Sequence, residues 1–303
     1  MQHLGELAAF GTALCWTASA LFFERSAKRV GALAVNFYKV AGAFVLLAIT
    51  GLLTRGMPLP LDAPAKAWIY LPISGFIGFV VADYFLFNSY ILVGSRRATL
   101  FQPLSPLFAA GLGYLVLGEK MHPQSLLGMG LVVLGIFIAL VARRKEGAAD
   151  NPVSRPSAAV VKGLLFALGS AFFNAVGLIF SKLGLGGYDA VSGTEIRVMT
   201  AVVGFGLQAL IFGEWRAVFV EAPKDAVAVR NTSIGTVFGP FLGVVFSLIA
   251  LQHTSAGATS TLSSLTPVLI ILPSVFMMKQ KVRAGEVLGA VVAVVGAALF
   301  FLL

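Results

Sequence analysis

Asp83 lies well inside an apolar stretch, GFIGFVVADYFLFNSY, where Tyr84, Asn88 and Tyr90 follow it. A carboxylate deep in a bilayer costs at least about 2.5 kcal/mol on insertion scales, so it should face protein or water rather than lipid. Such a group could bind a substrate ammonium group or carry a proton. The alternatives are an anchor that hydrogen-bonds to another helix and a group hydrated at the cytoplasmic end of its segment.

Two cations also lie in apolar stretches. Lys39 and Arg197 stand at corresponding positions of an internal repeat, and Glu195 accompanies the second of them. We expect both cations near the cytoplasmic ends of their segments, where they could form a gate. They could instead bind a substrate carboxylate, lysine as a point charge and arginine as a fork. Snorkelling to the headgroups is the alternative that these residue types favour.

Prolines mark two further stretches. Pro103 and Pro106 flank Ser105, and Pro267 follows Thr266. Proline removes an intrahelical hydrogen bond and can kink a helix, and the carbonyls freed in this way must face protein or a wet cavity. We therefore predict kinked helices in mid-membrane, either beside a substrate cavity and gate or as purely structural bends.

Aromatic and hydroxyl side chains complete the set of candidates. Trp16 and Tyr38 could recognise an apolar or aromatic substrate group, although rings also serve as packing or interfacial anchors. Thr259, Ser263 and Thr266 share one helical face, which could line a polar path or could hold helices together. The candidate cavity residues are Trp16, Tyr38, Asp83, Tyr84, Asn88, Gln102, Ser105, Asn174, Ser263 and Thr266.

No sequence signature of catalysis accompanies these residues. The patterns HExxH, CxxC, G-x-S-x-G and GxxxxGK[ST] do not occur in the chain, so metal hydrolysis, nucleophile-elbow chemistry and a nucleotide-driven pump are not indicated. The three histidines are scattered, and the single Cys15 offers no metal cluster. We expect no enzymatic activity, no catalytic residue, no metal and no cofactor.

The composition is that of an integral membrane protein. Of the 303 residues, 58% are hydrophobic and 12% are charged, whereas soluble domains carry about 25% charged residues. The mean hydropathy is +0.92. The net charge of +9 sits mainly in short connectors between apolar segments, which is the pattern of membrane orientation and does not indicate nucleic-acid binding.

Ten apolar segments are long enough to span a bilayer as helices. They are 4–24, 33–54, 67–92, 97–118, 123–142, 162–182, 189–212, 231–252, 257–278 and 284–303. The longest polar stretch separates the first five from the last five. We therefore predict an all-α membrane protein with a first repeat at 1–142, a cytoplasmic linker at 143–161 and a second repeat at 162–303.

The two halves resemble each other at nearly constant spacing. A shift of 158 residues aligns the early segments and a shift of 161 aligns the later ones, and the alignment pairs Trp16 with Asn174, Lys39 with Arg197, Ser105 with Thr266, Pro106 with Pro267 and Gly135 with Gly296. An odd number of spans in each half makes this an inverted-topology repeat, which is a transporter signature. Asp83, however, corresponds to Val244.

Connectors numbered along the chain differ sharply in charge. Sixteen Lys and Arg residues fall in the odd-numbered connectors and four in the even-numbered ones. The positive-inside rule then places the odd connectors in the cytoplasm and both termini outside. The start of the chain has no basic region before its apolar stretch, so we expect no cleaved signal peptide.

The stretch QPLSPLFAAGLGYLVLGEKM, with Pro106 and the Gly118-Glu119 pair, and the following LLGMGLVVLGIF resemble the drug/metabolite transporter superfamily in its ten-helix, EamA-type branch. In length and segment order the chain is most similar to YddG-type aromatic amino acid exporters. It departs from the pattern at Lys279-Gln280, where the second half lacks the Gly-Glu pair.

This resemblance implies a secondary transporter of the bacterial inner membrane that exports aromatic or neutral amino acids and related small metabolites by alternating access. Its partners would be a small-molecule substrate and the lipid bilayer, without nucleic acid. A monomer is one option for the oligomeric state, which stays open. The alternatives are export of other drugs or metabolites, such as purines or viologens, and, from other classes, a lipid-handling membrane protein or a membrane-embedded enzyme.

Overall fold

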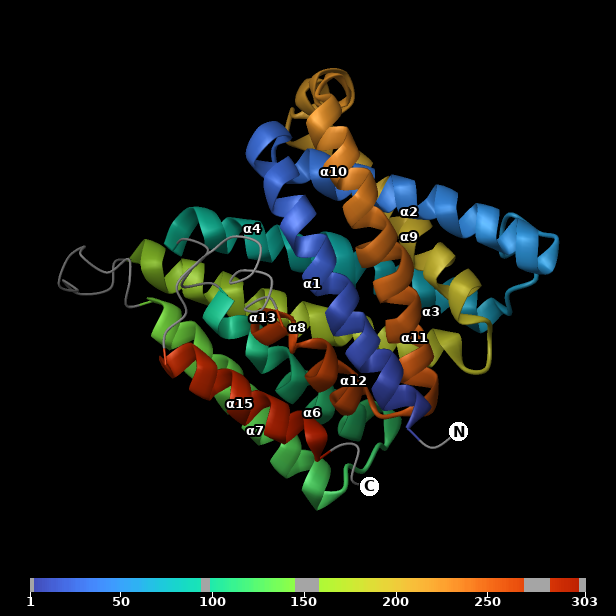
Figure 1. Ribbon diagram of the computed structural model, residues 1–303. Coiled ribbons are helices and arrows are strands. Elements are labelled where there is room, and N and C mark those ends of the chain that lie inside the picture. The colour runs from blue at the N-terminus through green and yellow to red at the C-terminus, as the bar shows by residue number, and fades with distance from the viewer. Residues whose placement is uncertain (1–2, 94–98, 145–157, 270–283, 300–303) are drawn as a thin grey trace.

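The computed structural model describes residues 3–93, 99–144, 158–269 and 284–299, and these residues form helices joined by short connections, without a strand (Figure 1). The α-helices are α1 (Leu4–Val30), α2 (Ala32–Arg55), α3 (Ala65–Gly75), α4 (Ala82–Val93), α6 (Ser105–Leu117), α7 (Pro123–Arg144), α8 (Ala158–Leu185), α9 (Ala190–Ile211), α10 (Ala226–Thr236), α11 (Val244–His253), α12 (Ala256–Ser263), α13 (Thr266–Leu269) and α15 (Ala284–Ala298). Five shorter helices with other hydrogen-bond patterns are η1 (Phe76–Val81), η2 (Thr99–Leu104), η3 (Ala217–Glu221), η4 (Ala222–Lys224) and η5 (Val237–Gly243).

Seven of the described helical stretches are long and apolar enough to cross a bilayer. Two shorter apolar helices, Phe101–Leu117 and Ala284–Ala298, fall where the sequence predicts the fourth and tenth spans. Part of the predicted ninth span, 257–278, lies outside the described residues. The structure is thus an all-helical membrane protein, while the count of ten spans stays a prediction.

Two of the long helices contain a π-helical segment. Helix α3 continues through η1 into α4, and α10 continues through η5 into α11, without a break in right-handed helical backbone. The first residues of the two π segments, Phe76 and Val237, are 161 residues apart, which is the repeat spacing. A π turn holds an extra residue and often marks a functional site. The two halves therefore deform their third helix at the same point.

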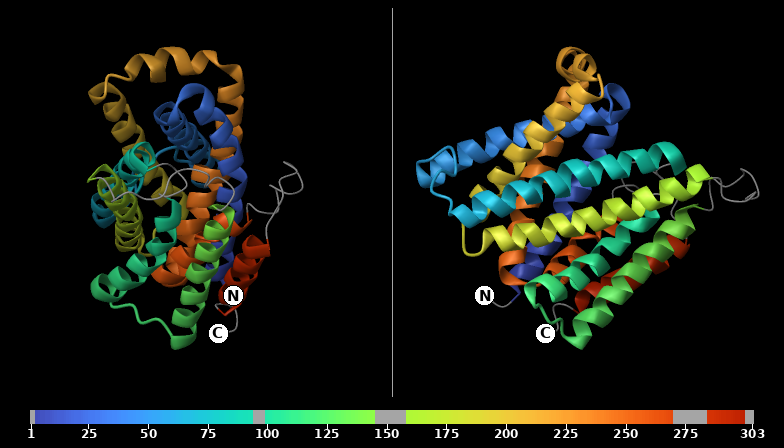
Figure 2. Two further views of the ribbon diagram at one scale, coloured as in Figure 1. Left: turned by 90° about the vertical axis from the view of Figure 1, so that its left-hand side faces the viewer. Right: turned by 180° about the vertical axis from the view of Figure 1, so that it is seen from behind.

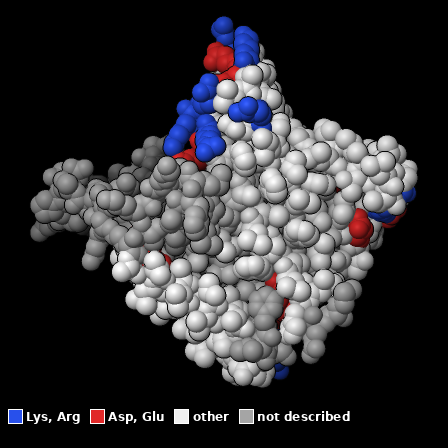
Figure 3. All heavy atoms as spheres, viewed as in Figure 1, with Lys and Arg blue, Asp and Glu red and all other residues white. Residues whose placement is uncertain are grey.

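The surface agrees with a bilayer environment. Large apolar side chains point outward all along the helices, and Leu53, Leu115 and Ile211 are each more than three quarters exposed. On the face shown in Figure 3, Lys, Arg, Asp and Glu gather at the extremities and leave a nearly uncharged band between them. Such a surface is stable only where lipid covers it.

Contacts between helices follow a repeated scheme (Figures 1 and 2). Helix α1 packs against α10, η5, α11 and α12 of the second half, and α8 packs against α3, η1, α4, η2 and α6 of the first half. Helix α2 packs on α9, and α7 packs on α15. Two similar halves related by a twofold axis would give this contact pattern. Whenever an element of the first half contacts an element of the second, the two equivalent elements also contact each other.

The described connectors gather on two opposite sides of the molecule (Figure 1). We call the side with residues 56–64, 118–122, 186–189 and 254–255 the even end, and the side with Gly31 and residues 212–225 the odd end. Glu119 ties the even end together, since it accepts from the Ala256 N–H at 2.9 Å and pairs with Lys182 at 2.5 Å. Lys182 in turn donates to the carbonyl of Thr254 at 2.6 Å.

The peripheral helices α7 and α15 approach each other through glycines. A Cβ at Gly135 would overlap the backbone of Gly289 and Ala293, and one at Gly289 would overlap that of Ala139. Small residues of this kind let membrane helices pack backbone to backbone, where dispersion replaces the missing hydrophobic force. Gly130, on the same helix, has open space around it.

We predict that Gly135→Ala destabilises the protein relative to Gly130→Ala. Both changes add the same helix propensity, but only the first forces backbone apart, at a cost of about 1 to 3 kcal/mol. Titration with SDS, followed by tryptophan fluorescence, measures the two unfolding free energies. Equal values for the two variants would show that the α7–α15 contact is looser than described.

Candidate functional site

The prolines mark helix junctions rather than bends in continuous helices. The sequence predicts Pro106 in mid-helix, but the fourth span changes from the 3₁₀ segment η2 to α6 at Ser105, so Pro106 stands in the first turn of α6. There its missing N–H costs nothing. Pro103 lies inside η2. The ninth span is interrupted at 264–265, where α12 ends and α13, with Pro267, begins.

Polar side chains at these junctions face the first helix of the opposite half. Gln102 donates to the Ser170 hydroxyl of α8 at 3.4 Å. At the corresponding places, Ser263 donates to the Ala9 carbonyl of α1 at 3.5 Å and Thr266 to that of Ala13 at 3.4 Å. These weak contacts join helices across the repeat boundary, so Ser263 and Thr266 serve helix packing in this conformation.

Two buried hydroxyls, one at the η2–α6 junction and one within α12, are left without a partner among the described residues. Ser105 and Thr259 are buried, and their hydroxyl oxygens make no hydrogen bond to any described residue. An unsatisfied buried hydroxyl costs roughly 1 to 3 kcal/mol, so water, a ligand or another conformation is expected to satisfy it. These hydroxyls are therefore polar points in the membrane interior.

Asp83 pairs with Lys39, as a buried carboxylate in a membrane should pair with a cation. The Lys39 Nζ lies 3.6 Å from the carboxylate, and the side chains of Lys39 and Asp83 are 12% and 22% exposed. The ammonium group also lies over the Phe23 ring, 5.8 Å from its centre. The two residues, predicted separately from sequence, thus form one site that links α2 to α4 within the first half.

Neighbours of Asp83 point elsewhere. The Tyr84 side chain is 38% exposed and its ring lies beside Phe85 and Phe212. Asn88 bonds back to the Tyr84 carbonyl at 2.8 Å, within its own helix. The prediction that Tyr84 and Asn88 belong to the same site as Asp83 gains no contact from the structure, because successive residues of a helix point about 100° apart.

Arg197 and Lys39, the residues of the predicted cytoplasmic gate, lie apart. Helices α2 and α9 pack side by side, and Arg55 at the last residue of α2 donates to Ser192 near the start of α9, so the two helices run antiparallel. Lys39 near the start of α2 and Arg197 near the start of α9 consequently lie toward opposite ends of the molecule. The structure therefore does not bring the two residues together at one end, and it gives no contact that supports a single cytoplasmic gate formed by both.

Around Arg197 the protein is tightly packed and short of partners. The residue is 6% exposed, and its guanidinium lies 4.9 Å from the centre of the Phe79 ring. Its Nε makes no hydrogen bond to a described residue. Two residues earlier, Glu195 is 1% exposed and has one carboxylate oxygen without a described partner.

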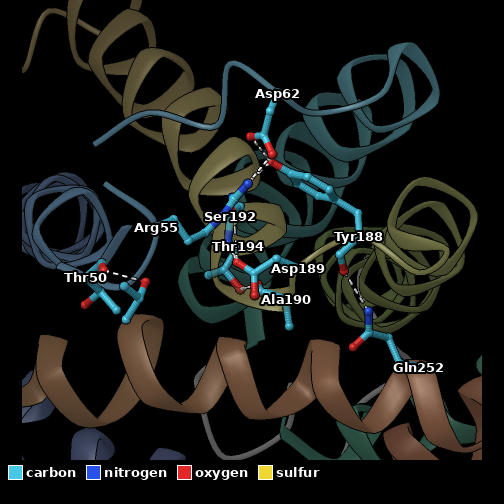
Figure 4. Close-up of polar contacts among 10 residues, drawn as sticks. Thr50, Arg55, Asp62, Tyr188, Asp189, Ala190, Ser192, Thr194 and Gln252 are labelled. Atoms are coloured by element: carbon cyan, nitrogen blue, oxygen red, sulfur yellow. Dashed lines mark hydrogen bonds and ion pairs between the residues drawn. The ribbon is translucent and has the colours of Figure 1, made fainter. Parts of the chain in front are cut away.

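Arg55 is the centre of a polar network that the sequence did not single out (Figure 4). It contacts Asp62 as an ion pair, donates to the Ser192 hydroxyl, and reaches the Tyr188 hydroxyl at 3.3 Å. Tyr188 donates to Asp62 at 3.0 Å, and Asp189 lies 4.0 Å from Arg55. This Arg55 network joins the connector after α2 to the start of α9. An arginine at the end of a span, seven residues before an aspartate, was the signal available in the sequence.

A close contact between two helices and a pocket between two others occupy equivalent places toward the two ends. We call the close contact, between α3 and α9, the α3–α9 seam. At the even end, a Cβ on Gly75 of α3 would overlap the Arg197 carbonyl of α9, so these helices touch through their backbones. At the odd end, the equivalent pair is α10 and α2, and between them lies a pocket of about 530 Å³. Tyr38, a predicted cavity residue, lines it together with Gly42, Thr232 and Thr236.

Trp16 and Asn174 lie at less constrained places. Trp16 is partly buried, and its indole nitrogen would contact a Cβ at Gly243 in η5. Asn174 is exposed on α8. Tyr38 donates to the Val218 carbonyl at 3.1 Å. Of these three predicted residues, the structure brings only Tyr38 to a pocket.

At the odd end, Asp225 fastens α10 to α1. Its carboxylate accepts from the Ala228 N–H at 2.9 Å, which caps α10, and from Arg29 of α1 at 2.7 Å. Ser26 adds a bond to the Ala228 carbonyl at 2.9 Å. The backbone N–H of Ala228 and then the Arg29 side chain hold the pKa of Asp225 below its ordinary value. The ionised form is therefore favoured in the folded protein.

We predict that Asp225→Ala lowers the thermal unfolding midpoint at pH 7 more than Asp225→Asn does, because asparagine still caps α10. The depressed pKa makes the contribution of the charge complete above the ordinary value of about 3.9 and lost as the pH falls through the lowered value. The difference between wild type and Asp225→Asn should therefore shrink as the pH falls below about 3.9 and vanish once the carboxyl is protonated in the folded protein as well. Melting curves in detergent measure it, and a gap that persists in acid would contradict the assignment.

The fold and these buried charges define a multi-pass helical membrane protein built of two similar halves, a class that includes many transporters. The chain belongs to the EamA-like transporter family, whose model matches residues 3–141 and again residues 161–302. The protein is accordingly a membrane transporter of small molecules by family.

A solved structure described only as the crystal structure of a protein superimposes with a TM-score of 0.76. It is 20% identical in sequence, and the match covers 100% of this chain and 98% of the other. This likeness shows the fold alone. No curated protein matches the sequence. Among the described residues, no group of three or more His, Cys, Asp or Glu side chains could hold a metal ion.

Proposed function

We propose that the protein is a secondary transporter that exports neutral and aromatic amino acids, and related small metabolites, across the bacterial inner membrane by alternating access. The observation that carries this proposal is the difference between equivalent places at the two ends. The α3–α9 seam is closed backbone to backbone, whereas the α2–α10 pocket is open. Alternating access requires that two similar halves can exchange their packings, so that the path opens first to one side and then to the other.

The proposed topology has ten spans in two inverted repeats, 1–142 and 162–303, with the linker 143–161 in the cytoplasm. Supporting it are the twofold pattern of helix contacts, the π segments at equivalent positions, and the separation of Lys39 and Arg197 toward opposite ends. The excess of Lys and Arg in odd connectors makes the odd end cytoplasmic and places both termini outside. The described conformation is then closed to the outside.

Transport in this scheme exchanges the two packings. The α2–α10 pocket closes while the α3–α9 seam opens, and the Arg55 network releases. The interrupted fourth and ninth helices, with Pro103, Pro106 and Pro267 at their junctions, supply the flexible points. Trp16, Gln102, Ser105 and Asn174 are proposed to line the path between the two openings, and Asp83 with Lys39 forms its charged site.

Amino acids are the proposed substrates for two reasons. The similarity to YddG-type exporters favours them, and the interior combines few charges of both signs with a largely apolar lining, which suits a zwitterion carrying an apolar side chain. A strongly anionic substrate would need more interior cations than the described helices contain.

We expect purified protein in liposomes to take up labelled phenylalanine and threonine faster than protein-free liposomes, with and without a pH gradient. Purines and viologens are tested as unlabelled competitors and, in labelled form, as substrates. Their uptake in the absence of amino acid uptake would replace amino acids by the alternative substrates. Rates equal to those of protein-free liposomes for the whole panel would contradict the transporter proposal itself.

The Arg55 network should hold the outer side shut. Because the chain has one cysteine, Cys15→Ala gives a cysteine-free background, and Ala67→Cys places a reporter in the closed seam, where Ala67 of α3 is fully buried in one cluster with Ile196 of α9. Adding Arg55→Gln should raise labelling of this cysteine by an external, membrane-impermeant maleimide several-fold.

The matched control is Arg216→Gln, which removes an exposed arginine 3.9 Å from Glu221 at the odd end. This change should leave labelling of the reporter unaltered. Equal labelling in the Arg55→Gln and Arg216→Gln backgrounds would mean that the network does not govern the seam.

A further inference from the structure

Arg197 is a charge without a counterion. It is 6% exposed, its guanidinium sits beside Gly78 and over the Phe79 ring, and it forms no hydrogen bond or ion pair with a described residue. A cation inside a membrane helix costs roughly 2.5 to 3.5 kcal/mol on insertion scales. A ring face returns about 2 kcal/mol at a desolvated site. The Nε–H donor of the guanidinium is left without a partner among the described residues.

The repeat shows what is missing. Lys39, the equivalent cation, has its counterion in Asp83, 3.6 Å away. The position equivalent to Asp83 in the second half is Val244, which is apolar and 4% exposed. The first half thus has an internal carboxylate beside its buried cation, and the second half has an apolar residue at the equivalent position.

The described carboxylates near Arg197 point away from it or pair with another cation. Glu195 is two residues away on the same helix, which points it to the opposite side, toward Gly51 of α2. Asp62 and Asp189 pair with Arg55 at the end of the seam. Among the described residues, none is placed to neutralise Arg197, which leaves the guanidinium available to a carboxylate from outside the chain.

We propose that Arg197 binds the carboxylate group of the transported substrate, and that this site is exposed when the α3–α9 seam opens. The inference rests on the proposed function and specifies its substrate class, namely small molecules with a free carboxylate and an apolar or aromatic remainder. Guanidinium binds a carboxylate through two parallel N–H···O bonds. Phe79, already stacked on the guanidinium, offers an apolar surface for the remainder.

Closure of the seam around an empty Arg197 buries the charge at a cost. In the proposed export direction, the substrate carboxylate reaches Arg197 as the seam opens and leaves it toward the outside. Substrate therefore favours the conformation in which Arg197 is reachable, by the difference between its affinities for the two states. Lys39 cannot play the same role while Asp83 neutralises it.

The test uses the full chain in proteoliposomes with labelled phenylalanine in counterflow. Phenylalaninamide and phenethylamine, which lack the carboxylate, serve as competitors. In the wild type, phenylalanine should compete at least tenfold better than either analogue. Arg197→Gln should raise the KM for phenylalanine at least tenfold and abolish this discrimination, and Arg197→Lys should retain part of it.

Thermal melting separates binding from structure. Removal of an unpaired buried charge should leave the melting temperature of Arg197→Gln equal to or above that of wild type, while the stabilisation of wild type by added phenylalanine disappears. A large drop in melting temperature would mean that Arg197 is structural. Unchanged KM and discrimination in a transporting Arg197→Gln protein would overturn this inference and leave the proposed function standing. Absence of transport by the wild type would overturn both.

Discussion

A bilayer gives no water to a charge or to a free backbone group, and this constraint governs every polar feature of the interior. Asp83 is tolerable because Lys39 lies beside it, and Arg197 is tolerable only over an aromatic ring. The same constraint explains the glycines of the α3–α9 and α7–α15 contacts, since helices that gain nothing from burying apolar surface must gain from close dispersion contact. The charged groups around Arg55 and Asp225 lie at the two ends of the molecule, where hydration is possible.

Symmetry and its violations together describe how such a molecule can work. Equivalent helices, π segments and helix junctions recur in the two halves, and the proposed exchange of packings would use these equivalent elements. The differences lie in side chains: an acid at 83 against an apolar residue at 244, and a glycine at 75 against Thr236. The first makes the two sides chemically distinct, and the second makes one closed contact tighter than its counterpart.

Much of the fold follows from the sequence because long apolar runs, Lys and Arg bias and fixed spacing are one-dimensional signals. The approximate helix positions are readable in this way, and the family model matches each of the two predicted halves. Side-chain direction is not readable, because one residue rotates a helical position by about 100°; hence Tyr84 and Asn88 were grouped with Asp83 and turn elsewhere. Arg197 was expected at the same end as Lys39, whereas the antiparallel packing of α2 and α9 separates the two residues toward opposite ends of the molecule. The Arg55 network joins residues far apart in sequence, and only its Arg55–Asp62 pair, seven residues apart, leaves a local signal.

The π segments η1 and η5 make the third helix of each half sensitive to the number of its residues. Each holds one residue more per turn than an α-helix, so the part that follows is rotated by about a quarter of a turn relative to an uninterrupted helix. Asp83 lies just after η1 and owes its direction toward Lys39 to that rotation. Loss of a single residue from this stretch would restore a regular helix and swing the carboxylate away from its partner, so that chain length, as much as residue type, sets the electrostatics of the interior.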